Sequence, residues 1–195
     1  MARTDSACAW PARLPGRGTF RFVALSVCLL LDGRADKAVR SLWQRLEDAG
    51  VGSLLTHTHG RHRPHVTLAS LLDSDDAALP ALLTRLQPCR DQEPVTVRFD
   101  ALGIFRRSRC WLVPEANREL LDRQEQAVRA CDGTNALLHR NYAEGAWTPH
   151  LTLAPRLHLE RLPVVAGLAF DILPVEATLG PLVVVDTTTG DVHPV

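Results

Sequence analysis

The stretches RHRPHVTLAS at residues 61–70 and AWTPHLTLAP at residues 146–155 share one pattern, Pro-His-apolar-Thr-Leu-Ala. Side chains alternate between two faces along a β-strand, so the histidine, threonine and alanine of each copy share one face and two aliphatic residues share the other. Proline lacks a backbone N–H and therefore suits the first residue of a strand better than its middle. Each copy predicts a strand that presents one imidazole and one hydroxyl on one face and anchors to a core through the other.

The segments that precede the two copies also agree in order. Each half has an apolar strand, a helical pattern that stops at a glycine, and a connector that leads to the motif. The separation is 34 residues from Leu31 to His65 and 37 residues from Val113 to His150. A repeat of this size predicts two similar lobes related by an approximate two-fold axis, with the two motif strands facing each other across the join.

The remaining hydrophobic pattern predicts further helices and strands. Apolar residues at helical spacing, bounded by glycine or proline, indicate helices, and runs rich in β-branched and aliphatic residues indicate strands. We expect helices at residues 34–50, 75–86 and 114–133, and a short one at 159–168. We expect strands at residues 22–31, 65–72, 94–105, 110–113 and 150–155, followed by two final strands joined at Gly180-Pro181.

Composition limits the class of protein. With 195 residues and 46% apolar residues, the chain can bury a sizeable core as one domain over residues 20–195, preceded by a loose leader at residues 1–19. Lys plus Arg and Asp plus Glu both total 22, so the bulk charge does not attract long nucleic acids or anionic membranes, and any anion must be met locally. The five cysteines are scattered and lack metal or redox spacing, which indicates a reducing, cytoplasmic compartment.

The repeated motif suits phosphodiester cleavage without a metal. If His65 and His150 face each other, one neutral imidazole can act as base and one charged imidazole as acid, because imidazole titrates near pH ~6.5. The hydroxyls of Thr67 and Thr152 can donate hydrogen bonds to the non-bridging oxygens of a phosphate. No cofactor or metal ion is expected for this chemistry.

PHVTL and PHLTL resemble the two signature motifs of the 2H phosphoesterase superfamily, which includes the bacterial 2′-5′ RNA ligase or RNA 2′,3′-cyclic phosphodiesterase proteins. The intervening DALGIFRRSRCWLV at residues 100–113 is similar to that family's segment between the motifs, a Gly-x-Phe followed by a short strand with tryptophan. The resemblance extends from about Phe20 to the C-terminus. It implies a duplicated, bilobal α+β fold in which two antiparallel sheets line a central cleft and helices lie outside.

The resemblance also implies roles for single residues. His65 and His150 would be the catalytic acid and base, respectively, and Thr67 and Thr152 would hold the phosphate. Relatives often carry an arginine directly after the second motif, where this chain has Pro155 and then Arg156, so Arg156 is a candidate phosphate contact.

Other residues are candidates for the mouth of the cleft. Phe105, Trp147 and Tyr142 could stack on a base. The basic turn formed by Arg106, Arg107 and Arg109 could follow a phosphate backbone, although a charged turn is usually only solvated. The expected substrates are small RNA ends, oligonucleotides or cyclic nucleotides with a 2′,3′-cyclic phosphate or a 2′-5′ linkage. The protein is expected to be a monomer that does not bind membranes.

Two alternatives remain open at this stage. His57, His59 and His62 in HTHGRH are similar to the H-x-H-x-D-H zinc signature of metallo-β-lactamase-like hydrolases, but Arg61 stands where that signature has a carboxylate. The other alternative is a binding module that grips a nucleotide or an RNA end without chemistry. Both motifs are intact, which favours the enzyme.

Overall fold

The computed structural model describes residues 23–106 and 109–195. The expected leader at residues 1–19 and Arg107 of the basic turn lie outside the described residues. Within the described residues, mixed helices and strands form an α+β fold with an eight-stranded sheet in which every strand pair is antiparallel. This confirms the expected fold class.

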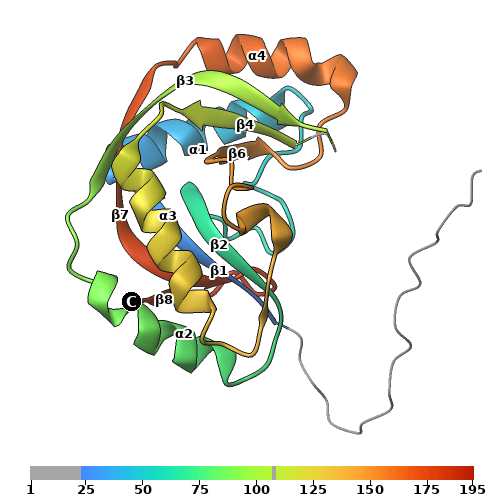
Figure 1. Ribbon diagram of the computed structural model, residues 1–195. Coiled ribbons are helices and arrows are strands. Elements are labelled where there is room, and N and C mark those ends of the chain that lie inside the picture. The colour runs from blue at the N-terminus through green and yellow to red at the C-terminus, as the bar shows by residue number, and fades with distance from the viewer. Residues whose placement is uncertain (1–22, 107–108) are drawn as a thin grey trace, which may run out of the picture.

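The sheet has the strand order β5-β2-β1-β7-β3-β4-β6, and β8 pairs with β7 (Figure 1). The strands are β1 (Val23–Leu31), β2 (His65–Ser74), β3 (Val95–Phe105), β4 (Arg109–Pro114), β5 (Leu137–Leu138), β6 (Leu151–Ala154), β7 (Val175–Asp186) and β8 (Val192–Pro194). The helices are α1 (Gly33–Asp48), α2 (Ala78–Leu86), α3 (Arg118–Cys131) and α4 (Leu162–Phe170), with short 3₁₀ turns at Gln87–Cys89, Arg140–Tyr142 and Leu159–Arg161.

Strand β7 joins the two halves of the sheet. Its residues 175–179 pair with β3, whereas Leu179 and residues 182–186 pair with β1. The expected pair of strands joined at Gly180-Pro181 is therefore wrong, since both residues lie inside β7 at the point where it changes partner. Pro181 cannot donate a backbone hydrogen bond, and it lies where the pairing with β1 is irregular. The two expected sheets are the two halves of this one sheet.

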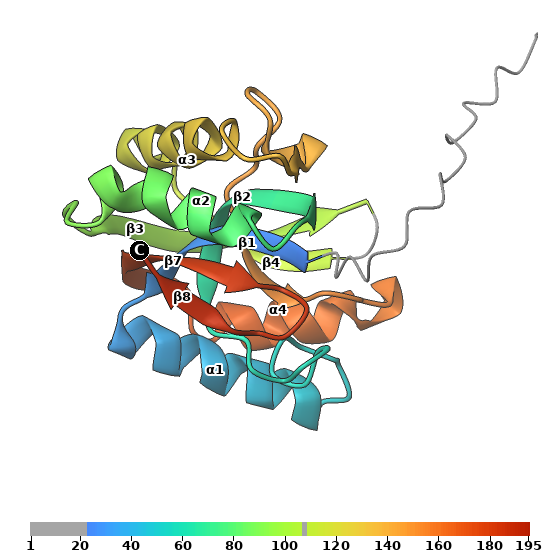
Figure 2. The ribbon, with the colours of Figure 1, turned by 90° about the horizontal axis from the view of Figure 1, so that it is seen from below.

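Helices cover both sides of the sheet. Figure 2 shows α2 and α3 on one side and α1 and α4 on the other. Helix α1 is capped by Asp32, whose carboxylate accepts hydrogen bonds from the backbone N–H groups of Arg34 and Ala35. None of the helices among the described residues is both long enough and apolar enough to cross a membrane.

Helix α3 begins later than the sequence predicts. Pro114 ends strand β4 instead of opening a helix, and the helix starts at Arg118. The reason is the cap, because the side chain of Asn117 accepts a hydrogen bond from the backbone N–H of Leu120. Helix α3 lies on the side of the sheet that carries Leu68 of β2, and both Leu68 and Leu120 are buried in the core.

A close contact between β3 and β4 places an aromatic side chain next to the second motif. Gly103 lies opposite Trp111, and a Cβ atom at Gly103 would lie 2.3 Å from the Trp111 ring. Trp111 is 7% exposed, and its strand β4 pairs with β6 at Thr152. The Gly-x-Phe segment therefore has a packing role, since only glycine lets the indole lie flat on β3.

We expect Gly103→Ala to lower the free energy of unfolding by about 1 to 3 kcal/mol, because the added methyl group forces the Trp111 indole out of its position. Gly167→Ala is the matched control, since a Cβ there meets nothing within 4 Å and alanine favours the helix by about 0.5 to 1 kcal/mol. Urea unfolding of both variants measures the difference. Equal stability of the two variants would contradict the packing role of Gly103.

Candidate active site

The two motif strands meet with open edges. Strand β2 pairs with β1 along its length but with β5 only at Leu71 and Leu72, so its segment His65–Ala69 has one free edge. Strand β6 pairs only with β4 and ends the sheet on the other side. The two strands contact each other, as the repeat predicts. The structure therefore brings both motifs to the join between the halves.

Both histidines are held in the same way. The Nδ1 atom of His65 lies 2.6 Å from the carbonyl oxygen of Arg63, and Nδ1 of His150 lies 2.7 Å from that of Thr148. A carbonyl oxygen only accepts hydrogen bonds, so in each neutral ring Nδ1 carries the proton and donates it, and Nε2 keeps a free lone pair. Each bond spans the proline of the motif. The Pro-His pair thus sets both the orientation and the tautomer of its imidazole.

The surroundings of both rings favour the neutral form. Burial lowers the pKa of His150 to about 4, and the charges of Arg109 and His65 act in the same direction, while the Thr148 carbonyl opposes them. Burial also lowers the pKa of His65. Both imidazoles are therefore neutral at pH 7 in the free protein, and each can accept a proton at Nε2.

Aromatic rings enclose His150. The ring centroid of Phe105 lies 5.0 Å from that of His150 in an edge-on arrangement, and the Trp111 centroid lies 5.7 Å away. Phe105 and Trp111 stack on each other at 4.9 Å. Phe105, expected to stack on a base, thus packs against the catalytic candidate as well as lining the cavity described below. This packing accounts for much of the burial that lowers the pKa of His150.

The two threonines have different surroundings. Thr67 is 9% exposed, and its hydroxyl lies 3.6 Å from the Cys28 thiol. Burial raises the pKa of Tyr142 to about 12, and a hydrogen bond with Thr67 opposes that shift, so the Tyr142 hydroxyl stays protonated beside Thr67. Thr152 is half-buried on the edge strand β6. The first motif therefore carries a tyrosine hydroxyl next to its threonine.

Two tryptophans hold the backbones of these threonines. The indole N–H of Trp43 in α1 donates to the carbonyl of Thr152 at 3.2 Å, and that of Trp147 donates to the carbonyl of Thr67 at 3.0 Å. Each tryptophan comes from the half of the sequence that does not contain its threonine. These two carbonyls, on strands that each have one free edge, thereby receive an indole donor.

A cavity of about 600 Å³ adjoins His150. Trp147 lines it, and three arginines give it positive charge. A direct contact between Trp147 and a substrate remains a prediction. Its lining residues are Ser70, Phe105, Arg106, Arg109, His139, Arg140, Asn141, Tyr142, Ala146, Trp147, Thr148 and His150. Sequence reasoning missed the contribution of residues 139–141. Their signal was the long irregular stretch between α3 and β6, since long loops in compact domains usually serve a function.

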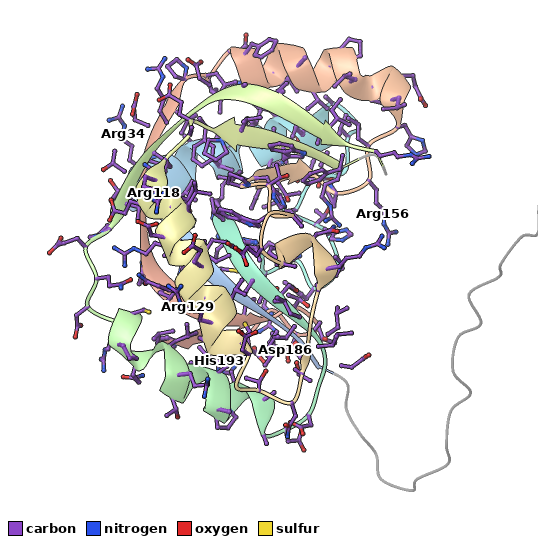
Figure 3. All side chains as sticks on the ribbon, in the orientation of Figure 1. Arg34, Arg118, Arg129, Arg156, Asp186 and His193 are labelled. Carbon is purple, nitrogen blue, oxygen red and sulfur yellow. The ribbon has the colours of Figure 1, made fainter. Side chains whose placement is uncertain are left out.

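Arg156 lies apart from this cavity. It is exposed, does not appear among the lining residues, and lies at the periphery of the molecule (Figure 3). Burial lowers the pKa of His57, and the charges of Arg156 and Arg109 lower it further, so Arg156 acts on the histidine connector. A direct contact between Arg156 and a phosphate remains a prediction.

The three connector histidines lie close together. The ring centroids of His59 and His62 are 4.1 Å apart, and those of His57 and His62 are 6.0 Å apart. Even so, no group of three or more His, Cys, Asp or Glu side chains in residues 23–106 and 109–195 is arranged to hold a metal ion. The zinc alternative therefore gains no ligand set from this part of the chain.

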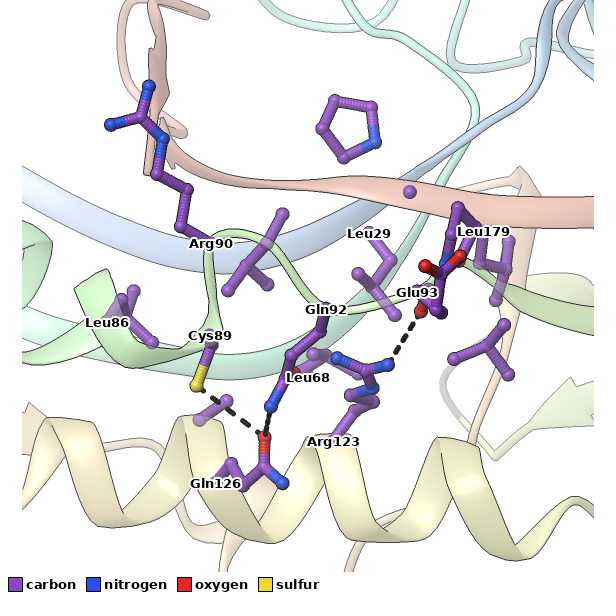
Figure 4. A pocket seen from close by; sticks show the side chains of 16 residues that line it. Leu29, Leu68, Leu86, Cys89, Arg90, Gln92, Glu93, Arg123, Gln126 and Leu179 are labelled. Atoms are coloured by element: carbon purple, nitrogen blue, oxygen red, sulfur yellow. Dashed lines mark hydrogen bonds between the residues drawn. The ribbon is translucent and has the colours of Figure 1, made fainter.

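A second cavity, of about 360 Å³, lies between α3, the segment after α2, and the sheet (Figure 4). Its floor is apolar, and its polar groups bind one another. Gln126 accepts hydrogen bonds from Gln92 at 2.9 Å and from the Cys89 thiol at 3.5 Å, and Arg123 donates to the Glu93 carbonyl at 2.6 Å. Because these groups already have partners, the cavity beside His150 is the better candidate for chemistry.

Known proteins share this fold. The model of the 2′-5′ RNA ligase superfamily matches residues 31–191. The crystal structure of a phosphoesterase is similar, with a TM-score of 0.57 and 16% identity over 90% of this chain and 96% of that chain. E. coli LigT complexed with 3′-AMP has a TM-score of 0.57 and 16% identity over 89% of this chain and 95% of that chain.

A third similar structure is the protein TT0787 of Thermus thermophilus, with a TM-score of 0.57 and 18% identity over 83% of this chain and 87% of that chain. No curated protein sequence matches the chain significantly. At these identities the structural similarities establish the fold, and the family assignment rests on the superfamily model.

We expect Trp43→Phe to lower the free energy of unfolding by about 0.5 to 1.5 kcal/mol, because it removes the N–H that donates to the partly buried carbonyl of Thr152. Trp111→Phe serves as the control, because the indole N–H of Trp111 is buried without a hydrogen-bond partner among the described residues, so this change removes the same atoms but no hydrogen bond. Thermal unfolding followed by circular dichroism compares the two. If Trp43→Phe is as stable as the control, the indole bond contributes nothing.

Proposed function

Because the chain belongs to the 2′-5′ RNA ligase superfamily, we propose that it is a metal-independent phosphodiesterase acting on RNA ends with a 2′,3′-cyclic phosphate or on 2′-5′-linked oligonucleotides. One observation carries the proposal. His65 and His150 both donate through Nδ1 to a backbone carbonyl, which leaves two Nε2 atoms for proton transfer at the join. Two equivalent imidazoles on opposite strands suit a reaction that needs one base and one acid.

The proposed mechanism is an in-line attack of water on the phosphorus. Nε2 of neutral His150 takes a proton from the water as its oxygen bonds to phosphorus. Protonated His65 gives its Nε2 proton to the ribose oxygen as the P–O bond to that oxygen breaks. The hydroxyls of Thr67 and Thr152 donate hydrogen bonds to the non-bridging oxygens, where negative charge develops.

Substrate binding would supply the acid. Both imidazoles are neutral in the free protein at pH 7, so one must gain a proton before it can act as acid. A bound phosphate diester is an anion, and an anion close to an imidazole favours its charged form. His65 receives this role because its partner His150 also lies near the positive charge of Arg109, which disfavours a second cation.

The ligands bound in structures with a similar fold support nucleotides as ligands of this protein. Crystal structures show E. coli LigT complexed with 3′-AMP, with NADP+ and with ATP. The cavity beside His150 offers aromatic surfaces for a base and arginines for phosphates, as such ligands require. We propose that this protein works on nucleotide ligands as a monomer, with residues 20–195 forming one bilobal domain.

The decisive experiment is a substrate panel with purified protein. Adenosine 2′,3′-cyclic phosphate, a dinucleotide that ends in a 2′,3′-cyclic phosphate, and 2′-5′-linked adenylate are each incubated with and without a chelator. Hydrolysis that is insensitive to the chelator is expected, because imidazolium and hydroxyl donors stabilise the charge. Binding of all three without hydrolysis would favour the non-catalytic module. Activity abolished by chelation and restored by zinc would falsify the proposal in favour of a metallohydrolase.

We expect His65→Ala and His150→Ala each to lower kcat by about 10² to 10⁴, because each removes one proton-transfer partner. The double variant should be little slower than either single variant, since the two groups act in one step. His158→Ala is the matched control, as that side chain is 84% exposed and lies outside the cavity. A double variant slower by the product of the two single effects would contradict concerted action.

The pH dependence of kcat/KM should form a bell on the acidic side of neutrality. This quantity reports the free protein, in which one pKa is about 4 and the other lies below 6.5. The rate falls below about pH 4, where the base is protonated, and falls above the higher pKa of the pair, where the acid is lost. An initial-rate profile from pH 3.5 to 9 checks this, and a maximum above pH 7 would contradict it.

A further inference from the structure

The cavity extends well beyond the place where the reacting phosphate would lie. Ser70 lines it and follows Thr67 by three residues in β2, which corresponds to about 10 Å along the strand. The backbone N–H of His139 donates to the carbonyl of Ser70 at 2.8 Å, and Leu138 pairs with Leu71. These bonds anchor the segment that carries Arg140 and Asn141 at this far end.

The end of the cavity near Ser70 is positively charged, and no carboxylate in the cavity lining offsets this charge. The cavity lining contains Arg106, Arg109 and Arg140 but no Asp or Glu. Across the described part of the chain none of these three arginines forms an ion pair, whereas Arg98 pairs with Asp100, Glu115 and Glu176. A cavity lined by three guanidinium groups that have no carboxylate partner among the described residues is a site for a second anion.

The position of Arg109 links this charge to the catalytic pair. Its charge lowers the pKa of His150, of His57 and of Tyr142, in each case as a smaller cause than burial. In the β3–β4 ladder Arg109 pairs with Phe105, whose ring centroid lies 5.0 Å from that of His150, so Arg109 lies at the His150 end of the cavity, whereas Arg140 lies at the Ser70 end. An anionic chain that starts at His150 and leads toward Ser70 would therefore meet Arg109 first and Arg140 next.

We propose that Ser70, Arg140 and Asn141 form a subsite for a second phosphate, the 5′ phosphodiester of the nucleotide whose 2′,3′-cyclic phosphate reacts. This inference rests on the proposed function and narrows it to nucleotide chains with at least two nucleotides. Arg140 pairs with the non-bridging oxygens of the second phosphate, and Asn141 and Ser70 supply neutral hydrogen bonds. Tyr142 and Trp147 line the wall between the two phosphates, where a base can stack.

Three substrates test the subsite directly. They are adenosine 2′,3′-cyclic phosphate, the adenosine dinucleotide ending in the same cyclic phosphate, and that dinucleotide with an uncharged methylphosphonate linkage. We expect kcat/KM to be about 10- to 100-fold higher for the dinucleotide than for the mononucleotide, the range of a charge-assisted hydrogen bond. The methylphosphonate dinucleotide should lose most of this advantage. Equal kcat/KM for the charged and uncharged dinucleotides would overturn the inference.

Variants locate the effect. In Arg140→Gln the ratio of kcat/KM between dinucleotide and mononucleotide should fall toward one through a higher KM for the dinucleotide, and Arg140→Lys should restore part of it. Arg34→Gln removes the same charge from the first turn of α1, outside the cavity, and should keep the wild-type ratio. A ratio that is unchanged in Arg140→Gln, or reduced equally in Arg34→Gln, would contradict the subsite.

Binding separates this inference from the proposed function. Calorimetric titration with the product dinucleotide, which carries a terminal phosphomonoester and one linking phosphate, measures the subsite without turnover. If no cyclic phosphate is opened but binding still depends on the linking phosphate and on Arg140, the proposed function fails and the subsite stands. If cyclic phosphates are opened but binding depends neither on the linking phosphate nor on Arg140, the subsite is contradicted and the proposed function stands.

Discussion

The active-site candidate depends on two open strand edges that are closed by indoles. Thr67 and Thr152 lie on strands whose free edges face the join, and a backbone carbonyl there needs a donor. Trp147 and Trp43 supply it, each from the other half of the sequence. The two halves are thus tied at the residues that present the hydroxyls. A further strand paired along these edges would cover the motif residues. A single indole donor satisfies one carbonyl and leaves the rest of the edge accessible.

The proline before each histidine helps to position the imidazole. It begins the strand without using a backbone N–H, and the residue before it offers its carbonyl to the imidazole Nδ1. Burial then keeps both rings neutral, and on His150 it does so with help from Arg109. The free protein therefore holds two bases, and the charge of a bound phosphate would convert one into an acid. In the proposed enzyme, binding and activation are the same electrostatic event.

Local charge in this protein differs from its overall charge. Equal numbers of basic and acidic residues give no net field, yet the cavity beside His150 is lined by arginines and lacks carboxylates. Acidic residues elsewhere are used in ion pairs such as those around Arg98. A protein without net charge that has a positive cavity at its candidate site attracts anions there at short range only. This suits small nucleotide ligands better than long nucleic acids.

The sequence by itself determined the duplicated motif, the meeting of the two motif strands and the main helices and strands, because strand and helix periodicity depend on neighbouring residues. Only the tertiary structure decided that Gly180-Pro181 lies inside a strand and not in a turn. Strand β7 continues through these two residues because its first part pairs with β3 and its last part pairs with β1. The bond from Trp43 to Thr152 spans 109 residues, and Arg140 reaches the cavity only because Ser70 anchors its loop. Such contacts join segments distant in the chain, so no local pattern encodes them.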